Sequence, residues 1–187
     1  MIRFCDCNFC KKKQEIKNSY DIYEKNYLID DVNIDFDVRV AALCKYDCSK
    51  YNKKATCPPV IPGFEYYRRA LMGYKNICVI GRRYPYSDGL FIAHWRKYST
   101  NEIHYLLLQK ETELFRSGFV YAKSFIGGSC KYCESSKCGP DRCSVPSKGR
   151  VPLEGTGINV YSLMKSIALP FQEPPEEYFW RIGCVFY

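Results

Sequence analysis

Residues 100–126 read TNEIHYLLLQKETELFRSGFVYAKSFI, and this stretch decides the class of the fold. Thr100–Ser117 is predicted to be a helix, because its apolar side chains recur at helical spacing and Gly118 provides a stop. Phe119–Ile126 is rich in aromatic and β-branched residues and is predicted to be a strand that leads into a pair of glycines. A long helix followed directly by a strand indicates a protein that combines helices with a sheet.

Segments on both sides extend this pattern. Further strands are predicted over Tyr20–Ile29, Ile34–Val40, Asn76–Ile80 and Tyr178–Phe186, and further helices over Glu65–Tyr74 and 152–168. We therefore expect a single α+β (or α/β) domain over residues 20–187, with a central mixed sheet and helices. Two Cys-rich loops, at 44–59 and 128–149, are inserted into it, and residues 1–19 form a separate Cys- and Lys-rich N-terminal segment.

Composition excludes several classes of protein. The chain has 187 residues, of which 47% are hydrophobic and 26% charged, so it is not disordered as a whole. No apolar run approaches the roughly 18 residues that a membrane span needs, and the first residues lack the apolar core of a signal peptide. We expect a cytoplasmic protein without a membrane partner. The net charge of +8 is spread along the chain, which disfavours nucleic acid as the partner.

The most unusual feature is a content of 12 Cys against 2 His. Without an export signal these cysteines are expected to be reduced thiols that are free to bind metal. Thiolate ligands suit zinc, copper(I) and iron–sulfur clusters. The cysteine spacing therefore becomes the main guide to function.

The second loop has the spacing C-x2-C-x4-C-x4-C, formed by Cys130, Cys133, Cys138 and Cys143. Four thiolates so close in sequence can surround one metal centre, and a [4Fe–4S] cluster takes one Cys per iron. Zinc is the alternative, but structural zinc sites usually use two C-x2-C pairs, and this loop has one. The spacing favours an iron–sulfur cluster over zinc.

The first loop has the spacing C-x3-C-x2-Y-x5-C-P-P and provides three cysteines, Cys44, Cys48 and Cys57. A cluster held by three cysteines leaves one iron open to water or substrate. The alternative is a fourth protein ligand that closes the site. The candidates for that ligand are Cys78, His94, His104, Cys184 and the N-terminal Cys5, Cys7 and Cys10, which could instead bind a separate metal.

Six other side chains are candidates to face a substrate or to support a cluster: Tyr51, Arg82, His94, His104, Arg150 and Glu154. Arginine can donate hydrogen bonds to a cluster sulfide or hold an anionic substrate. Structural roles compete with these functions. Arg150 could form an ion pair with Glu154, and His104 could be a buried helix residue whose hydrogen bonds are satisfied.

The two loops and their flanks resemble an uncharacterised family of predicted metal-binding proteins, the domain of unknown function 2284. The match covers about residues 38–168, with Asn159 in the place of the family's Asp and a longer gap between Cys133 and Cys138. The resemblance implies a metal, most plainly iron–sulfur, and no particular reaction. It is carried by Cys44, Cys48, Tyr51, Cys57, Pro58 and Pro59, then Phe115, Gly118, Ala122, Gly127, Gly128, Cys130 and Cys133, then Cys143, Pro146, Arg150, Pro152, Glu154 and Gly157–Val160.

Three functional hypotheses follow. The first, which we favour, is an enzyme or accessory factor in sulfur or redox chemistry, with one or two [4Fe–4S] clusters and a small-molecule substrate at an open iron. It predicts a pocket beside the first three cysteines, lined by groups such as Arg82, His94 or His104. The second is a closed two-cluster module that passes electrons to a redox partner protein. The third is a zinc-stapled domain that binds protein or nucleic acid.

Overall fold

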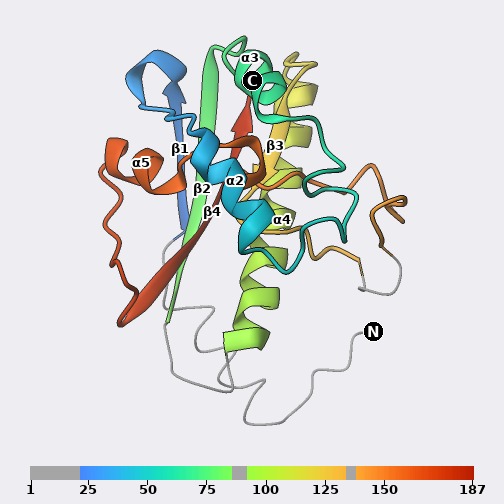
Figure 1. The fold of residues 1–187 in the computed structure, drawn as a ribbon. Coiled ribbons are helices and arrows are strands. Elements are labelled where there is room, and N and C mark those ends of the chain that lie inside the picture. Colours follow the sequence, from blue (N-terminus) through green and yellow to red (C-terminus); the bar gives the residue numbers. More distant parts are fainter. Residues whose placement is uncertain (1–21, 86–91, 134–137) are drawn as a thin grey trace, which may run out of the picture.

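The computed structural model describes residues 22–85, 92–133 and 138–187, with the side chains of 85 and 92–95 excepted. Its centre is one sheet of four strands in the order β1-β2-β4-β3 (Figure 1). The strands are β1 (Ile22–Leu28), β2 (Asn76–Pro85), β3 (Lys123–Ile126) and β4 (Tyr178–Phe186). Each neighbouring pair runs antiparallel, and the one parallel pairing described is an isolated bridge between Ile126 and Pro152.

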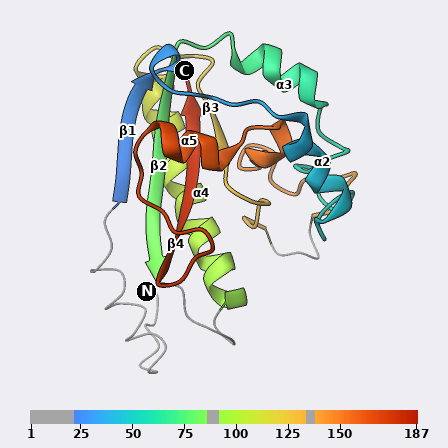
Figure 2. The same cartoon turned by 60° about the vertical axis from the view of Figure 1, so that its left-hand side comes forward.

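Helices cover both faces of this sheet. They are α2 (Val38–Tyr46), α3 (Phe64–Leu71), α4 (Ile92–Arg116) and α5 (Val160–Ser166), with 3-10 turns η1 (Ile29–Asp31) and η3 (Glu154–Thr156). Helix α4 packs along one face, and α3 and α5 pack on the other (Figure 2). The α+β class is thereby confirmed, although the sheet is antiparallel where a mixed sheet was expected. None of the described helices is long and apolar enough to cross a membrane.

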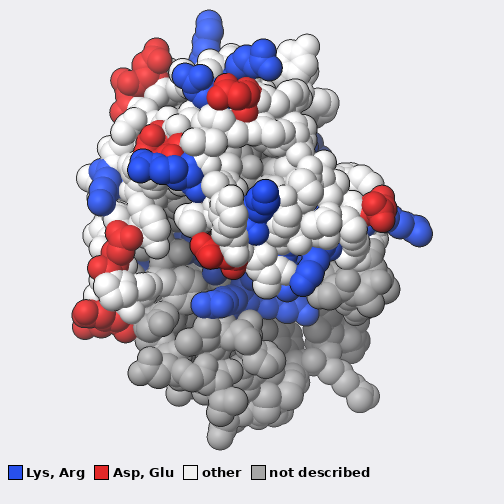
Figure 3. All heavy atoms as spheres, viewed as in Figure 1, with Lys and Arg blue, Asp and Glu red and all other residues white. Residues whose placement is uncertain are grey.

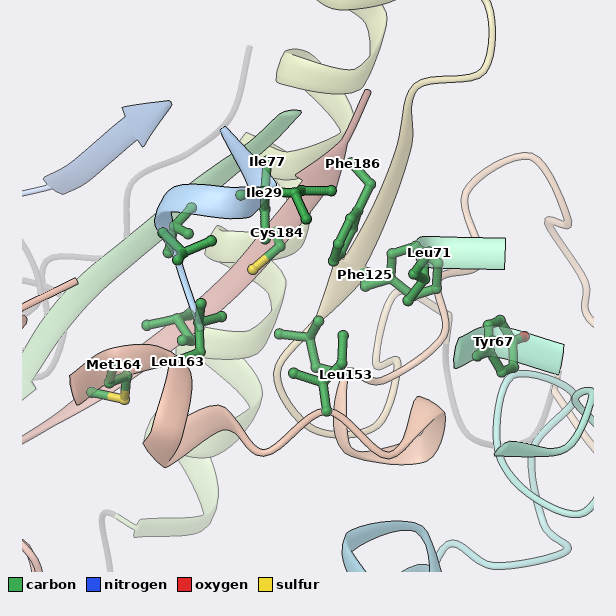
Figure 4. Close-up of a cluster of buried hydrophobic side chains, with 14 of the residues drawn as sticks. Ile29, Tyr67, Leu71, Ile77, Phe125, Leu153, Leu163, Met164, Cys184 and Phe186 are labelled. Atoms are coloured by element: carbon green, nitrogen blue, oxygen red, sulfur yellow. The ribbon is translucent and has the colours of Figure 1, made fainter. Parts of the chain in front are cut away.

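The alternation of apolar residues along the central strands creates the two cores. Ile77 and Val79 of β2 point to the face of α3 and α5, while Cys78 and Ile80 point to α4. On the α4 side, Ile103, Leu107 and Leu114 form the helical stripe that the sequence predicts. The other core is larger and reaches from η1 through β4 to α3 and α5 (Figure 4). The sheet is therefore buried on both faces.

One predicted strand is wrong and one predicted helix is only partly correct, because of a cap in the first case and a glycine turn in the second. The strand expected at Ile34–Val40 makes one isolated bridge, at Phe36, and gives way to α2 because Asp37 caps the backbone N–H of Arg39 at 2.8 Å. The helix expected at 152–168 is interrupted at Gly157, whose φ of +88° ends η3. Asn159 then accepts a hydrogen bond from the N–H of Ser162 and starts α5.

The boundaries of α4 and β3 also differ from the sequence prediction. Helix α4 begins eight residues before Thr100, at Ile92, and ends at Arg116. Strand β3 begins at Lys123, because Ala122 N–H bonds back to Phe119 O at 2.9 Å in a turn. The strand is therefore short and delivers the chain at once to the second cysteine loop.

Candidate metal centre

The first cysteine loop begins on a helix. Cys44 lies in the last turn of α2, which ends where Asp47 N–H bonds Leu43 O at 2.9 Å. Cys48 and Cys57 follow in a series of turns, one of which is closed by Cys57 N–H on Lys54 O at 3.0 Å. Cys57 is buried, Cys44 is half-buried and Cys48 is exposed.

These three thiols are electrostatic neighbours. Burial, and after it the nearby Cys48, raise the pKa of Cys44 to about 11 and that of Cys57 to about 12. Cys44 and Cys57 are therefore neutral thiols at neutral pH when no metal is bound. A bound metal centre would supply the positive charge that keeps them ionised.

The second cysteine loop leaves β3 through two glycines, and each is required. A side chain at Gly127 would collide with the carbonyl oxygen of Ile182, to which Gly127 N–H donates at 2.8 Å. Gly128 has a φ of +78°, a conformation that favours glycine. Together they turn the chain away from the sheet just before Cys130.

The structure brings the four cysteines of this loop close together. Cys130 is buried, and Cys133, Cys138 and Cys143 are half-buried. Burial raises the pKa of Cys143, and the three other thiols of the loop raise it further. Cys138 belongs to this group despite its longer gap from Cys133.

The two cysteine loops lie against each other. The buried ammonium of Lys54, from the first loop, donates to the carbonyl oxygen of Cys130 at 2.7 Å. Gly149 stands where the loops meet, since a side chain there would reach within 3.2 Å of Thr56 and 3.1 Å of the Cys143 thiol. The first and second sites therefore share one region of the molecule.

Basic side chains gather between the loops. Burial lowers the pKa of Lys131 to about 8, helped by the positive charges of Arg181, Arg96, Lys54 and Lys50. Among the residues that the structure describes, Lys54, Lys131 and Arg181 form no ion pair with a carboxylate. Figure 3 shows basic side chains close together in the lower half of the described surface. Such a concentration of positive charge suits an anionic centre.

The side chains available to bind a metal at these two loops are thiols. Within the described ranges, no three His, Cys, Asp or Glu side chains converge closely enough to share a single metal ion. The donors form instead one group of three thiols and one group of four, beside uncompensated cations. Thiols select soft metals, and their deprotonated form would offset the surrounding positive charge. The residues therefore fit a thiolate-bound metal centre.

A pocket opens beside the first site. It has a volume of about 570 Å³, and Cys44, Cys48 and Cys57 all line it. Tyr51 lies on the same wall, while Glu154 and Arg181 contribute the charged groups that face the pocket from elsewhere in the fold. Aromatic side chains close the remaining sides, including Tyr161, Phe171, Phe179 and Trp180. The pocket expected beside these three cysteines is therefore present.

Its lining differs from the expectation. Arg82 points to α4, where it pairs with Glu102 at 2.6 Å. His104 lies in the core beside the second loop: its Nε2–H donates to Lys148 O at 2.7 Å, and its Nδ1 faces the Cys130 sulfur at 4.0 Å. Neither reaches the pocket. The side chain of His94 lies outside the described residues, as do Cys5, Cys7 and Cys10.

Arg150 also has a different partner from the one expected. Its guanidinium pairs with Glu111 of α4 at 2.6 Å and bonds the Ser124 hydroxyl at 2.7 Å. Glu154 instead accepts the N–H of Gly128 at 3.0 Å, which braces the turn that leads to Cys130. Both side chains therefore hold the second loop in place.

Comparison with known proteins assigns the family. A family model described as "Predicted metal-binding protein (DUF2284)" matches residues 27–187. The chain belongs to this family. No curated protein and no solved structure gives a significant match. DUF2284 membership confirms the resemblance seen in the cysteine motifs and supports metal binding, without specifying the metal.

Three residues in this DUF2284 protein escaped the sequence analysis. Lys54 and Lys131 lie inside the cysteine loops, where lysine is ordinarily solvent-exposed and attracts no attention. Arg181 did leave a signal, because it is the lone charge in the strand Tyr178–Phe186, which is otherwise apolar or glycine. A single cation in an otherwise apolar strand indicates a partner or a ligand.

Proposed function

We propose that this protein binds an iron–sulfur cluster at each cysteine loop and uses the first as a reaction site for a small molecule. The observation that carries the proposal is that Cys44, Cys48 and Cys57 all line one pocket. In the described ranges no other cysteine and no histidine lines that pocket. A cluster there would be reachable by substrate.

Iron–sulfur fits the donors better than zinc. A zinc ion needs four ligands at about 2.0–2.3 Å from one point, so its thiolates must converge. A [4Fe–4S] cluster takes one thiolate at each iron, so its ligands stand further apart. The second loop has one C-x2-C pair, whereas structural zinc sites usually use two, so its spacing favours the cluster.

The three-cysteine site is the part of the proposal at which a reaction would take place. An iron with a free coordination position supplies Lewis acidity and electrons to a bound heteroatom. The chain's own part is to hold the cluster by three thiolates, to admit the substrate from the pocket and to surround it with aromatic side chains that limit water. The reaction class we propose is sulfur transfer, desulfuration or reduction.

A second candidate is electron transfer between two closed clusters. It is supported by the direct contact of the loops through Lys54 and Cys130. It requires a fourth ligand at the first site, and the N-terminal cysteines remain the candidates for it. A redox partner protein would then replace the small-molecule substrate.

An iron and sulfide assay with an absorption spectrum, on protein purified without oxygen, tests the proposal. We expect a brown protein that absorbs near 400 nm and carries about eight iron and about eight sulfide per chain. A colourless protein with zinc would contradict it and favour a zinc-stapled binding domain.

Variants separate the open site from the closed one. Cys48→Ala should remove about half of the iron, whereas Cys78→Ala, in the sheet core away from the loops, should leave it unchanged. The triple variant Cys5→Ala, Cys7→Ala, Cys10→Ala should retain both clusters if the first site is open. Loss of one cluster in that variant would favour the electron-transfer module.

A further inference from the structure

Arg181, a half-buried arginine of β4, differs from the two buried arginines, Arg82 and Arg150. Arg82 and Arg150 each have a carboxylate at 2.6 Å, from Glu102 and Glu111. Among the described residues, Arg181 has no carboxylate within ion-pair distance, and its buried Nε has no hydrogen-bond partner. Arg181 is half-buried with a fully buried Nε, and a partly desolvated guanidinium gains from an anionic partner, so this side chain is a candidate to bind one.

The surroundings of Arg181 leave room for that anion. Arg181 lines the pocket of the first cysteine site, and its Nη1 lies 3.3 Å from the place where a Cβ of Gly128 would stand. The guanidinium carbon lies 5.7 Å from the centre of the Phe179 ring, which supports the planar group from one side. The guanidinium is therefore held at the pocket by groups that leave its charge uncompensated.

The acidic residues of the pocket do not supply the missing partner. Glu154 attracts Arg181 electrostatically, but its oxygens accept the Gly128 N–H at 3.0 and 3.2 Å. Asp47 lies on the pocket wall at the end of α2 and forms no ion pair with Arg181. Arg181 is thus the cation available to a ligand.

The rest of the lining selects for an apolar body. The pocket lining also contains the apolar and aromatic side chains of Trp180, Phe171, Tyr161 and Met164. A volume of about 570 Å³ lies within the range of about 300–1,000 Å³ that is typical of small-molecule sites. A charged anchor beside a mainly apolar wall is a usual pattern of a site for a small organic ion.

We propose that the pocket binds a small organic carboxylate, with its charged end on Arg181, its apolar body against Trp180 and Phe171, and its other end toward Cys44, Cys48 and Cys57. This inference rests on the proposed function, because it names the substrate class of that site. Guanidinium and carboxylate match in planar shape and can form two parallel hydrogen bonds.

Benzoate, benzamide and inorganic phosphate are suitable probes, measured by calorimetry and by tryptophan fluorescence on the full-length protein purified without oxygen. We expect benzoate to bind at least about tenfold more tightly than the neutral benzamide, because a charged hydrogen-bond pair is lost in the amide. Equal binding of the two, or no binding of benzoate, would overturn the inference. Tighter binding of phosphate than of benzoate would contradict the proposal that the ligand has an apolar body.

Variants locate the effect. Arg181→Gln should weaken benzoate about 10- to 100-fold and leave benzamide unchanged, and Arg181→Lys should fall between. Arg116→Gln, an exposed arginine at the end of α4, is the matched control and should not alter binding. Retained benzamide binding shows that the Gln variant has folded. Unchanged benzoate binding in Arg181→Gln contradicts the inference.

Iron and sulfide content, measured on the same samples, separates the two proposals. Iron without benzoate binding removes the carboxylate inference and leaves the proposed function intact. Benzoate binding to a protein without iron does the reverse. If Arg181→Gln loses iron while it keeps its affinity for benzoate, Arg181 serves the metal centre, and the inference is wrong.

Discussion

The two cysteine sites use the same ligand atom in different settings. The second site draws four cysteines from one irregular loop and is held from behind by α4 through His104 and Glu111. The first site draws three cysteines from the end of a helix and the turns after it, and it faces a pocket. The second site packs against a helix of the core, whereas the first site lines a pocket large enough for a small molecule.

This difference teaches that cysteine count alone does not define a site's role. The second site has neighbours that fix its loop: the buried Arg150, the His104 ring and the braced turn at Gly128. The first site has an exposed cysteine, Cys48, and aromatic neighbours contributed by distant segments. We interpret the second as structural or electron-carrying and the first as the place where a ligand arrives.

Metal removal should give the largest effect and should affect the loops unequally. Residues 128–149 contain no described helix or strand, so a metal bound there should stabilise the loop, and structural metal sites can contribute about 10 kcal/mol or more. After anaerobic chelation, trypsin should cut at Lys131, Arg142 or Lys148 before it cuts in the first loop. Mass spectrometry of the fragments measures this order.

Restoring the metal serves as the control for that experiment, because it should protect the second loop again. Both loops contain lysines, so trypsin has sites in each. If the first cuts fall at Lys45, Lys50 or Lys53, the second loop does not depend on metal more than the first loop does, and the contrast is wrong.

Breaking the brace behind the second site should cost about 3–5 kcal/mol of unfolding free energy. Glu111→Gln leaves the guanidinium of Arg150 buried without its charge partner, and that loss has this typical size. Urea denaturation measures the change. Lys123→Gln is the matched control: it removes an exposed ion pair, at 3.7 Å from the same Glu111, and should cost less than about 1 kcal/mol. Similar losses in both variants would contradict the assigned role of Arg150.

The same pair predicts a smaller, pH-dependent effect. Burial opposes ionisation of Glu111, but hydrogen bonds from Ser124 and the charge of Arg150 outweigh it and hold its pKa below the usual 4.5. A lowered carboxyl pKa stabilises the fold above the unfolded-state value, and this stabilisation is lost as the pH falls through the folded-state value. The stability gap between wild type and Glu111→Gln should therefore be constant near neutral pH and narrow below about 4.5. Urea titrations at several pH values test this, and a gap that widens on acidification would disprove it.

The smallest effect concerns the pocket wall of the first site. Asn159 caps α5, and its side-chain amide donates to Asp35 at 3.2 Å. Asn159→Asp should still cap α5 but place two carboxylates together, at a cost of about 1 kcal/mol. Adding Asp35→Asn should restore the stability measured by thermal unfolding. If the double variant is no better than the single one, Asp35 is not the reason for asparagine at this position.

Local signals in the sequence predicted a large part of the fold. The β4 range and the stripe of α4 follow from alternation and helical spacing, which neighbouring residues determine. Residues 34–40 were predicted wrongly and 152–168 only partly correctly, because a single cap at Asp37 and a single turn at Gly157 outweighed the propensity of the segments around them. The antiparallel order β1-β2-β4-β3 depends on contacts between distant segments and left no local signal.

For the functional site, the sequence by itself identified the expected donors, two groups of cysteines of three and four, and a family of predicted metal-binding proteins. Thiol chemistry and short spacing are local properties, so they can be recognised from the amino-acid sequence alone. Only the tertiary structure decided which side chains surround the donors. In the folded protein Arg82 and Arg150 form ion pairs with carboxylates of α4. Arg181, on the last strand, lines the pocket that also contains Cys44. Burial and charge pairing arise from packing between segments far apart in the chain, and that packing left one arginine facing the space beside three thiols.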